Sequence, residues 1–126
     1  MDIQQLYSLN SVRTLLKSQL IKALVEFKGL PQELELPSAP KQFIQYLEED
    51  NRPQVTEDVN FEHGMGVSVG RLREDTVYDW KFVGLSHNTV RGAAGGAVLC
   101  AEFLTAKGYI ARKITDGAVM LEYKIF

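Results

Sequence analysis

The carboxyl-terminal half of the chain contains the strongest helical pattern. Residues 88–107 carry apolar side chains at spacings of three and four, which predicts one helix with an apolar face toward a core. Asn88 is the expected N-cap, because its side chain can accept a hydrogen bond from an N–H of the first turn. Gly108 follows the last turn and predicts a left-handed stop. The expected buried face consists of Val90, Ala93, Ala94, Ala97, Val98, Ala101 and Leu104.

A second amphipathic helix is predicted near the amino terminus, over residues 11–28. Ser11 is its candidate N-cap, and Gly29 ends it. Residues 1–10 show neither helical nor strand periodicity and are expected to be irregular. Residues 31–41 contain three prolines, which exclude a helix interior, so this segment is interpreted as an ordered connection.

Three short runs predict strands. Residues 43–47 form one apolar run, and residues 65–70 alternate apolar side chains with small residues. Residues 78–83 alternate aromatic and polar side chains. The last two runs are expected to pair as an antiparallel hairpin across a charged turn at 71–76, whereas the polar residues 57–64 predict a loop.

The tail carries a further hairpin pattern. Asp116-Gly117 is a strong signal for a two-residue turn, and apolar residues alternate with other types on both sides of it. The sequence therefore predicts an α+β fold, with two helices packed on a mixed or antiparallel sheet. We expect residues 1–126 to form a single domain in which residues 111–126 are an additional hairpin.

Composition and charge narrow the classes of function. The formal net charge is -2 and no basic cluster is present, which argues against nucleic acid and against an anionic membrane surface. No apolar run approaches the length of about 18 residues that a membrane span needs. Cys100 is the single cysteine, so no internal disulfide can form. These features favour a cytoplasmic protein without a metal site.

Three glycines fall within the first turns of the carboxyl-terminal helix. Gly92, Gly95 and Gly96 each cost about 1 kcal/mol relative to alanine inside a helix. Two explanations remain open at this point. A neighbouring backbone packs very close to the glycines, or a ligand lies against the start of the helix, where N–H groups and the helix dipole favour anions.

Other residues with reactive or charged side chains have structural interpretations. Cys100 lies among apolar residues and is expected to be a buried, unreactive thiol. His63 and His87 do not have metal-ligand spacing and are expected on the surface or at a helix cap. Arg71 and Arg73 suit a solvated turn or an ion pair, with contact to a carboxylate or phosphate as the alternative.

Four sequence blocks, in order, carry a resemblance to a known family. They are FKGLPQELELPSAPKQFIQYLEEDNRPQ, GMGVSVGRLRED, YDWKFVGL and SHNTVRGAAGGA. Together they are similar to the carboxyl-terminal, dimerisation-domain part of aspartate-semialdehyde dehydrogenase, in the branch found in archaea, fungi and some bacteria. The resemblance covers about residues 24–110. It departs at residues 55–58, VTED, where the family usually has proline and a basic-acidic-basic stretch.

The resemblance implies a site at the start of the glycine-bearing helix. In the family this helix start faces the nicotinamide side of NADP. Asn88 and Thr89 would supply hydrogen bonds to the cofactor, and Gly92 would let the backbone approach it. The nucleotide-binding βαβ unit, or Rossmann unit, the catalytic cysteine and the catalytic histidine lie upstream of the matched blocks in the family. No residue of this chain is therefore assigned a catalytic role.

The resemblance implies a truncated, aspartate-semialdehyde dehydrogenase-like protein. The parent reaction interconverts aspartyl phosphate and aspartate semialdehyde with NADP, in the biosynthesis of lysine, methionine and threonine. We expect the isolated chain to be inactive and to form a homo-oligomer or pair with a full-length homologue. Two alternatives stay open, a non-catalytic dimerisation or interaction module and a fragment of a related acyl-CoA reductase.

Overall fold

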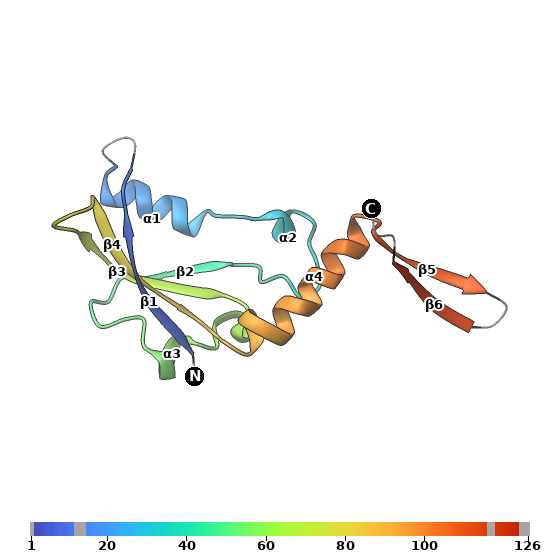
Figure 1. Cartoon of the computed structure of the whole chain (residues 1–126). Helices are drawn as coiled ribbons and strands as arrows, with labels where there is room; N and C mark the ends of the chain where they lie inside the picture. Colours follow the sequence, from blue (N-terminus) through green and yellow to red (C-terminus); the bar gives the residue numbers. More distant parts are fainter. Residues whose placement is uncertain (1, 12–14, 116–117, 124–126) are drawn as a thin grey trace.

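The protein consists of a four-stranded sheet flanked by helices and a separate two-stranded hairpin, as a computed structural model shows (Figure 1). The structure describes residues 2–11, 15–115 and 118–123. In chain order, the elements are β1 (Ile3–Leu9), α1 (Lys17–Val25), α2 (Leu30–Glu33), β2 (Ile44–Leu47), α3 (Val55–Asp58), the 3₁₀ turn η1 (Phe61–Gly64), β3 (Val67–Glu74), β4 (Trp80–Ser86), the π turn η2 (Val90–Ala94), α4 (Gly95–Ala106), β5 (Ile110–Thr115) and β6 (Ala118–Tyr123).

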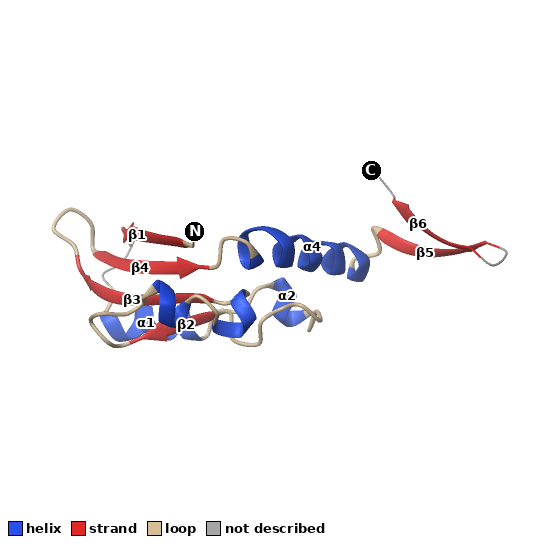
Figure 2. Cartoon of the chain, turned by 90° about the horizontal axis from the view of Figure 1, so that it is seen from below, coloured by secondary structure: helices blue, strands red, loops and turns tan. Residues whose placement is uncertain are grey.

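The main sheet has the strand order β1-β4-β3-β2. Strand β4 is antiparallel to both β1 and β3, whereas β2 is parallel to β3, so the sheet is mixed as predicted. The predicted hairpin is confirmed as β3–β4, and Figure 2 shows α4 continuing from the end of β4. Both strands run further than predicted, because β3 extends to Glu74 and β4 to Ser86. A register shift between Gly70 and Arg73 lets β3 continue through the charged segment.

The prediction of an irregular amino terminus was wrong. Residues Ile3–Leu9 form β1 and pair along their length with β4. Residues 4–9 are exposed, because β1 is an edge strand. An edge strand with no buried side has little need for alternation of apolar and polar residues, which is the pattern that sequence analysis detects. The Ser8 hydroxyl donates to Asp75 Oδ2 at 2.9 Å and fixes the end of the strand to the β3–β4 turn.

The first helix is shorter than predicted and begins later. Helix α1 spans Lys17–Val25 with Leu16 at its N-cap, where the Leu16 N–H donates to Gln19 Oε1 at 2.9 Å. Ser11 is not a cap, because its N–H and hydroxyl both donate to Asp79 Oδ2, at 2.8 and 2.9 Å. Leu20 is the one residue of α1 that is buried, and Leu16 stays 64% exposed. Residues 12–14, which the predicted helix included, lie outside the described residues.

The connection between α1 and β2 is ordered, as expected, but contains one helical turn. Helix α2 accommodates Pro31 because a proline in the first turn of a helix lacks an N–H that would have no partner there. Ser38 then joins the connection to α4, since its N–H and hydroxyl donate to the Glu102 carboxylate at 2.9 and 2.7 Å.

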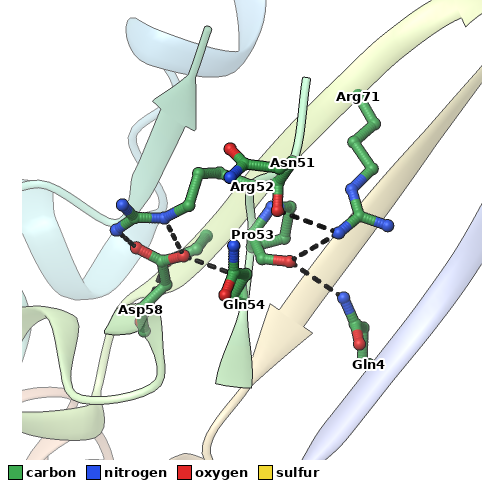
Figure 3. Close-up of polar contacts among 8 residues, drawn as sticks. Gln4, Asn51, Arg52, Pro53, Gln54, Asp58 and Arg71 are labelled. Atoms are coloured by element: carbon green, nitrogen blue, oxygen red, sulfur yellow. Dashed lines mark hydrogen bonds and ion pairs between the residues drawn. The ribbon is translucent and has the colours of Figure 1, made fainter. Parts of the chain in front are cut away.

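A polar network fastens the loop after β2 to the sheet (Figure 3). Arg52 donates through Nε to Asp58 Oδ2 at 2.7 Å and forms an ion pair through Nη2 with Oδ1. The Gln54 N–H also donates to Asp58, at 2.7 Å. From the sheet, Gln4 and Arg71 both donate to the Pro53 carbonyl, at 3.0 and 3.3 Å. Strands β1 and β3 therefore hold the same loop residue from two sides.

Helix α4 packs on the molecule through a face that differs from the predicted one. Leu99 joins Leu36 and Met65 in a buried cluster, and Phe103 packs against that cluster. Most of the residues predicted to be buried are exposed instead, namely Ala93, Ala94, Ala97, Val98 and Ala101. The helix is apolar on nearly every side, so its pattern left the orientation open. The large side chains Leu99 and Phe103 bury more apolar area than alanines can, and they set the orientation.

Strands β5 and β6 pair antiparallel beyond the end of α4. Ile110 pairs with Tyr123 at one end of this ladder, and Thr115 pairs with Ala118 at the other. Figure 1 shows this pair projecting away from the main sheet. The predicted Asp116-Gly117 turn lies outside the described residues. That residues 1–126 form one domain, with 111–126 as an addition, stays a prediction.

We predict that Asp58→Asn destabilises the fold in a pH-dependent way. The hydrogen bond from Arg52 holds the pKa of Asp58 below its ordinary value. A carboxyl whose pKa is lowered by folding stabilises the protein above its unfolded pKa of about 4, and that contribution disappears as pH falls through the folded pKa. At pH 7 the substitution should lower the free energy of unfolding by about 1–3 kcal/mol. Urea unfolding at several pH values measures this difference.

The control for this experiment is Asp50→Asn, which changes an exposed carboxylate next to the same loop. It should leave the free energy of unfolding nearly unchanged. Below the lowered pKa of folded Asp58, the Asp58→Asn chain and the parent chain should converge in stability, because both side chains are then neutral. A difference that stays constant from pH 7 to pH 3 would contradict this role of the ion pair.

Candidate functional site

The start of the glycine-bearing helix is a π turn capped by a histidine. The N–H of Gly92 donates to the His87 carbonyl at 3.1 Å and the N–H of Ala94 to the Thr89 carbonyl at 2.9 Å, each five residues back. The Val90 N–H donates to His87 Nδ1 at 3.2 Å. Nδ1 can accept this bond only when it carries no proton, so the neutral ring is protonated at Nε2. The expectation of a surface or capping role for His87 therefore holds.

Asn88 is not the cap that the sequence predicted. Its backbone N–H donates to Asp2 Oδ1 at 3.3 Å, and its side chain makes no capping bond. The imidazole of His87 takes the position instead, which the usual cap preferences for short polar side chains do not anticipate. The Asn88 side-chain oxygen lies close to Gly92, 3.4 Å from where a Cβ on that residue would be. Asn88, Thr89 and Gly92 are all exposed, so the structure brings them together on one surface.

The three glycines of this segment have different structural roles. A Cβ on Gly95 would lie 2.4 Å from Met65 Sδ and 2.9 Å from the Val90 carbonyl oxygen. A Cβ on Gly96 would lie 2.5 Å from the Arg91 carbonyl oxygen. Close packing therefore explains Gly95 and Gly96. Gly92 is different, because a Cβ there would meet its neighbours at ordinary contact distances of 3.4 Å and more.

A cavity of about 630 Å³ lies on one side of the helix start, between residues 37–41, residues 62–65 and α4. Glu62 and His63 border this cavity, and both have a left-handed backbone conformation, with φ of 51° and 56°. The carboxylate of Glu62 accepts the N–H of Lys41 at 3.1 Å, which links two walls of the cavity. His63 is exposed, as expected from the sequence.

Cys100 is a correction to the sequence analysis, because it is exposed on α4 and not buried. Its neighbours in the sequence are apolar, but α4 packs through Leu99 and Phe103, and Cys100 stays exposed. Among the described residues, no group of three histidine, cysteine, aspartate or glutamate side chains is arranged to hold a metal ion. In the same part of the chain, no helix is long and apolar enough to cross a membrane.

Arg71 and Arg73 bond to backbone and not to a carboxylate. Arg71 Nη2 donates to the carbonyls of Asn51 and Pro53, at 3.0 and 3.3 Å, and its φ of 54° lies at the register shift of β3. Arg73 Nη1 donates to the Arg71 carbonyl at 2.7 Å. Sequence reasoning missed two other charged residues, Asp58 in the loop network and Arg91 in the π turn. Arg91 could have been noticed as the one charged residue among the small ones that follow Val90.

Comparison with known proteins places these features in a family. The model of the "Semialdehyde dehydrogenase, dimerisation domain" family matches residues 9–91, which is more than half of the chain. The chain belongs to the semialdehyde dehydrogenase dimerisation-domain family. This match agrees with the resemblance and with the mixed sheet flanked by helices.

Three relatives with curated names are 47–48% identical to this chain. The chain is 48% identical to the aspartate-semialdehyde dehydrogenase of Candida albicans over 71% of this chain and 24% of that protein. It is 48% identical to that of Saccharomyces cerevisiae over 82% of this chain and 26% of that protein. It is also 47% identical to the malonyl CoA reductase (NADP) of Metallosphaera sedula, over 75% of this chain and 27% of that protein. The chain thus spans about a quarter of the length of these relatives.

A solved structure shows the same fold. The crystal structure of aspartate semialdehyde dehydrogenase with NADP from Candida albicans superposes with a TM-score of 0.72 and 39% sequence identity. The superposition covers 83% of this chain and 30% of that one. The predicted fold class is therefore confirmed as the dimerisation-domain portion of a semialdehyde dehydrogenase.

We predict that His87→Ala destabilises the helix start whereas Asn88→Ala does not. Removal of the imidazole leaves the Val90 N–H without its acceptor, and loss of an N-terminal cap costs about 1 kcal/mol. The Asn88 side chain makes no capping bond, so its removal should change stability by less than about 0.5 kcal/mol. Thermal or urea unfolding of the two variants measures the contrast. His87→Asn should recover part of the loss, and a larger effect at Asn88 than at His87 would refute the assignment.

Proposed function

We propose that this chain is the dimerisation part of an NADP-dependent aspartate-semialdehyde dehydrogenase-like protein, with Asn88, Thr89 and Gly92 facing the cofactor. In the full reaction, aspartyl phosphate and aspartate semialdehyde are interconverted with NADP as the hydride carrier. The protein would act in the cytoplasm as a homo-oligomer or as a partner of a full-length homologue. The family match, the named relatives and the NADP-bound structural neighbour support this proposal.

The single observation that carries the cofactor-facing role is the open space at Gly92. Packing and helix geometry account for the other two glycines, but nothing within the described residues requires a glycine at position 92. A glycine that costs about 1 kcal/mol in a helix and is not needed for packing is consistent with the close approach of a ligand to the backbone. Asn88 lies against the same spot, with its amide exposed, and an amide can both donate and accept hydrogen bonds.

An acyl-CoA reductase is a second candidate for the whole protein. The observation in its favour is the malonyl CoA reductase (NADP) of Metallosphaera sedula, which is as similar to this chain as the aspartate-semialdehyde dehydrogenases are. Both reactions reduce an activated acyl group to an aldehyde with NADPH. They differ in the leaving group, which is phosphate in one and a thiol in the other. The non-catalytic interaction module is the third candidate, and the family's description as a dimerisation domain favours it.

We predict that Gly92→Ala stabilises the fold but weakens cofactor use. The added methyl group fits at 3.4 Å from Asn88 Oδ1 and removes glycine's entropic cost, so the melting temperature of the chain should stay equal or rise. Cofactor use is measured in a hybrid enzyme, in which residues 24–110 of this chain replace the matching segment of the Candida albicans enzyme. In this hybrid, Gly92→Ala and Asn88→Ala, each made singly, should raise KM for NADP about three- to tenfold. A change of this size corresponds to the loss of one hydrogen bond or of one close contact.

Gly95→Ala is the matched control, because its methyl group would overlap Met65 Sδ. This variant should lower the melting temperature, which would separate a packing glycine from a ligand-facing one. If KM for NADP is unchanged in both Gly92→Ala and Asn88→Ala, the cofactor-facing role is wrong.

We predict no turnover by the 126-residue chain alone. Nucleophilic catalysis by a cysteine needs a base within hydrogen-bond reach, and no described hydrogen bond joins Cys100 to a histidine. The test is phosphate-dependent reduction of NADP by pure protein with aspartate semialdehyde, followed by absorbance. Activity that disappears in Cys100→Ala would contradict the prediction and would make Cys100 a nucleophile.

A further inference from the structure

Arg91 lies in an aromatic setting beneath the π turn. Its guanidinium carbon is 4.5 Å from the centre of the Phe43 ring, a cation–π contact. The Phe43 ring in turn contacts Phe27, with ring centres 5.7 Å apart. The guanidinium therefore lies against a pair of aromatic rings.

One nitrogen of this guanidinium lacks the partner that a buried donor needs. Arg91 Nη1 is fully buried and has no hydrogen-bond acceptor, and none of the described ion pairs involves Arg91. Burial lowers the pKa of Arg91, although an arginine remains charged at neutral pH. A buried donor without an acceptor is rare and costly in native proteins. The molecule therefore holds a positive group whose acceptor has to come from elsewhere.

A cleft borders this guanidinium. It has a volume of about 340 Å³ and is lined, besides Arg91, by Leu30, Pro31, Gly96, Leu99, Cys100 and Phe103. Arg91 is the one charged residue in its lining. A second cavity of about 210 Å³ adjoins it and shares both Pro31 and Arg91. The site thus combines apolar walls with a single fixed cation, in the size range of small-molecule sites.

We propose that this cleft binds the carboxylate of a small monocarboxylic acid, with Arg91 as the anchor and the acid's apolar chain against Leu99 and Phe103. A carboxylate matches the planar fork of arginine and offers the acceptor that Nη1 lacks. A phosphate group would carry a second negative charge, and no second cation lines the cleft to meet it. Nη1 is buried in the present structure, so binding requires a small displacement of the side chains around it.

This site is separate from the proposed cofactor-facing surface, since Asn88, Thr89 and Gly92 are absent from its lining. The two proposals can therefore fail independently. Cys100 provides the readout, because it is the only thiol in the sequence, is exposed and lines the cleft. An acid bound in the cleft should shield it from a neutral alkylating reagent.

The test measures the rate of Cys100 alkylation by iodoacetamide at constant ionic strength, with hexanoate, hexanamide or chloride added. Hexanoate should slow the reaction in a saturable way, whereas hexanamide, which has the same shape without the charge, should bind about tenfold or more weakly. Arg91→Met should weaken protection by hexanoate by about tenfold or more, and Arg91→Lys should give an intermediate value. Arg73→Met, which removes an exposed guanidinium, is the matched control and should not change protection.

Three outcomes would overturn the proposal. They are equal protection by hexanamide and hexanoate, full protection by hexanoate in Arg91→Met, and no protection by hexanoate in the parent chain. Arg91→Met should fold, because it replaces an unpaired buried charge with an apolar side chain of similar length. If it does not fold, the ¹⁵N NMR signal of Arg91 Nε in the parent chain decides the question, since hexanoate should shift it and hexanamide should not.

Discussion

The contact between Gly95 and Met65 determines how the functional end of the molecule is built. Gly95 has no side chain, so the methionine sulfur lies close to the helix backbone, where a Cβ at this position would overlap it. Leu99 is then directed into the cluster with Leu36 and Met65. The same orientation places Arg91 over Phe43 and leaves Gly92 facing outward. One packing constraint thus sets both surfaces that we propose to bind ligands.

Sequence analysis identified the elements whose patterns are local and strong. The alternation in β3 and β4 and the long helical period before Gly108 needed no tertiary information to be recognised. The edge strand β1 was missed because exposure on both faces leaves its composition nearly unconstrained. The buried face of α4 was mistaken because alanine, valine and leucine surround the helix on all sides. The orientation of the helix is determined by the large side chains of Leu99 and Phe103, which pack in the cluster with Leu36 and Met65.

The candidate site was predictable in its position but not in its chemistry. The glycines at the helix start indicated either close packing or a ligand, and the structure assigns packing to Gly95 and Gly96 while leaving Gly92 unexplained by it. His87 was expected on the surface or at a cap, but Asn88 was preferred as the N-cap, because the usual cap preferences favour short polar side chains. Arg91 was overlooked for a different reason. Its partner Phe43 lies 48 positions earlier in the chain (91 minus 43), which no local pattern connects.

The relatives show what this segment does not encode. One relative acts on a semialdehyde and another is a malonyl CoA reductase, yet their identities to this chain are 48% and 47%. Similarity over this segment therefore does not by itself distinguish the two kinds of relative.

The pairing of β1 with β4 brings Asp2 beside the start of the glycine-bearing helix, which lies 86 positions further along the chain. Asp2 precedes β1, and its carboxylate accepts the Asn88 N–H at 3.3 Å and lies 3.6 Å from His87 Nδ1. Asp2 therefore ties β1 to the first turn of the helix, and loss of its carboxylate would leave the Asn88 N–H without this acceptor.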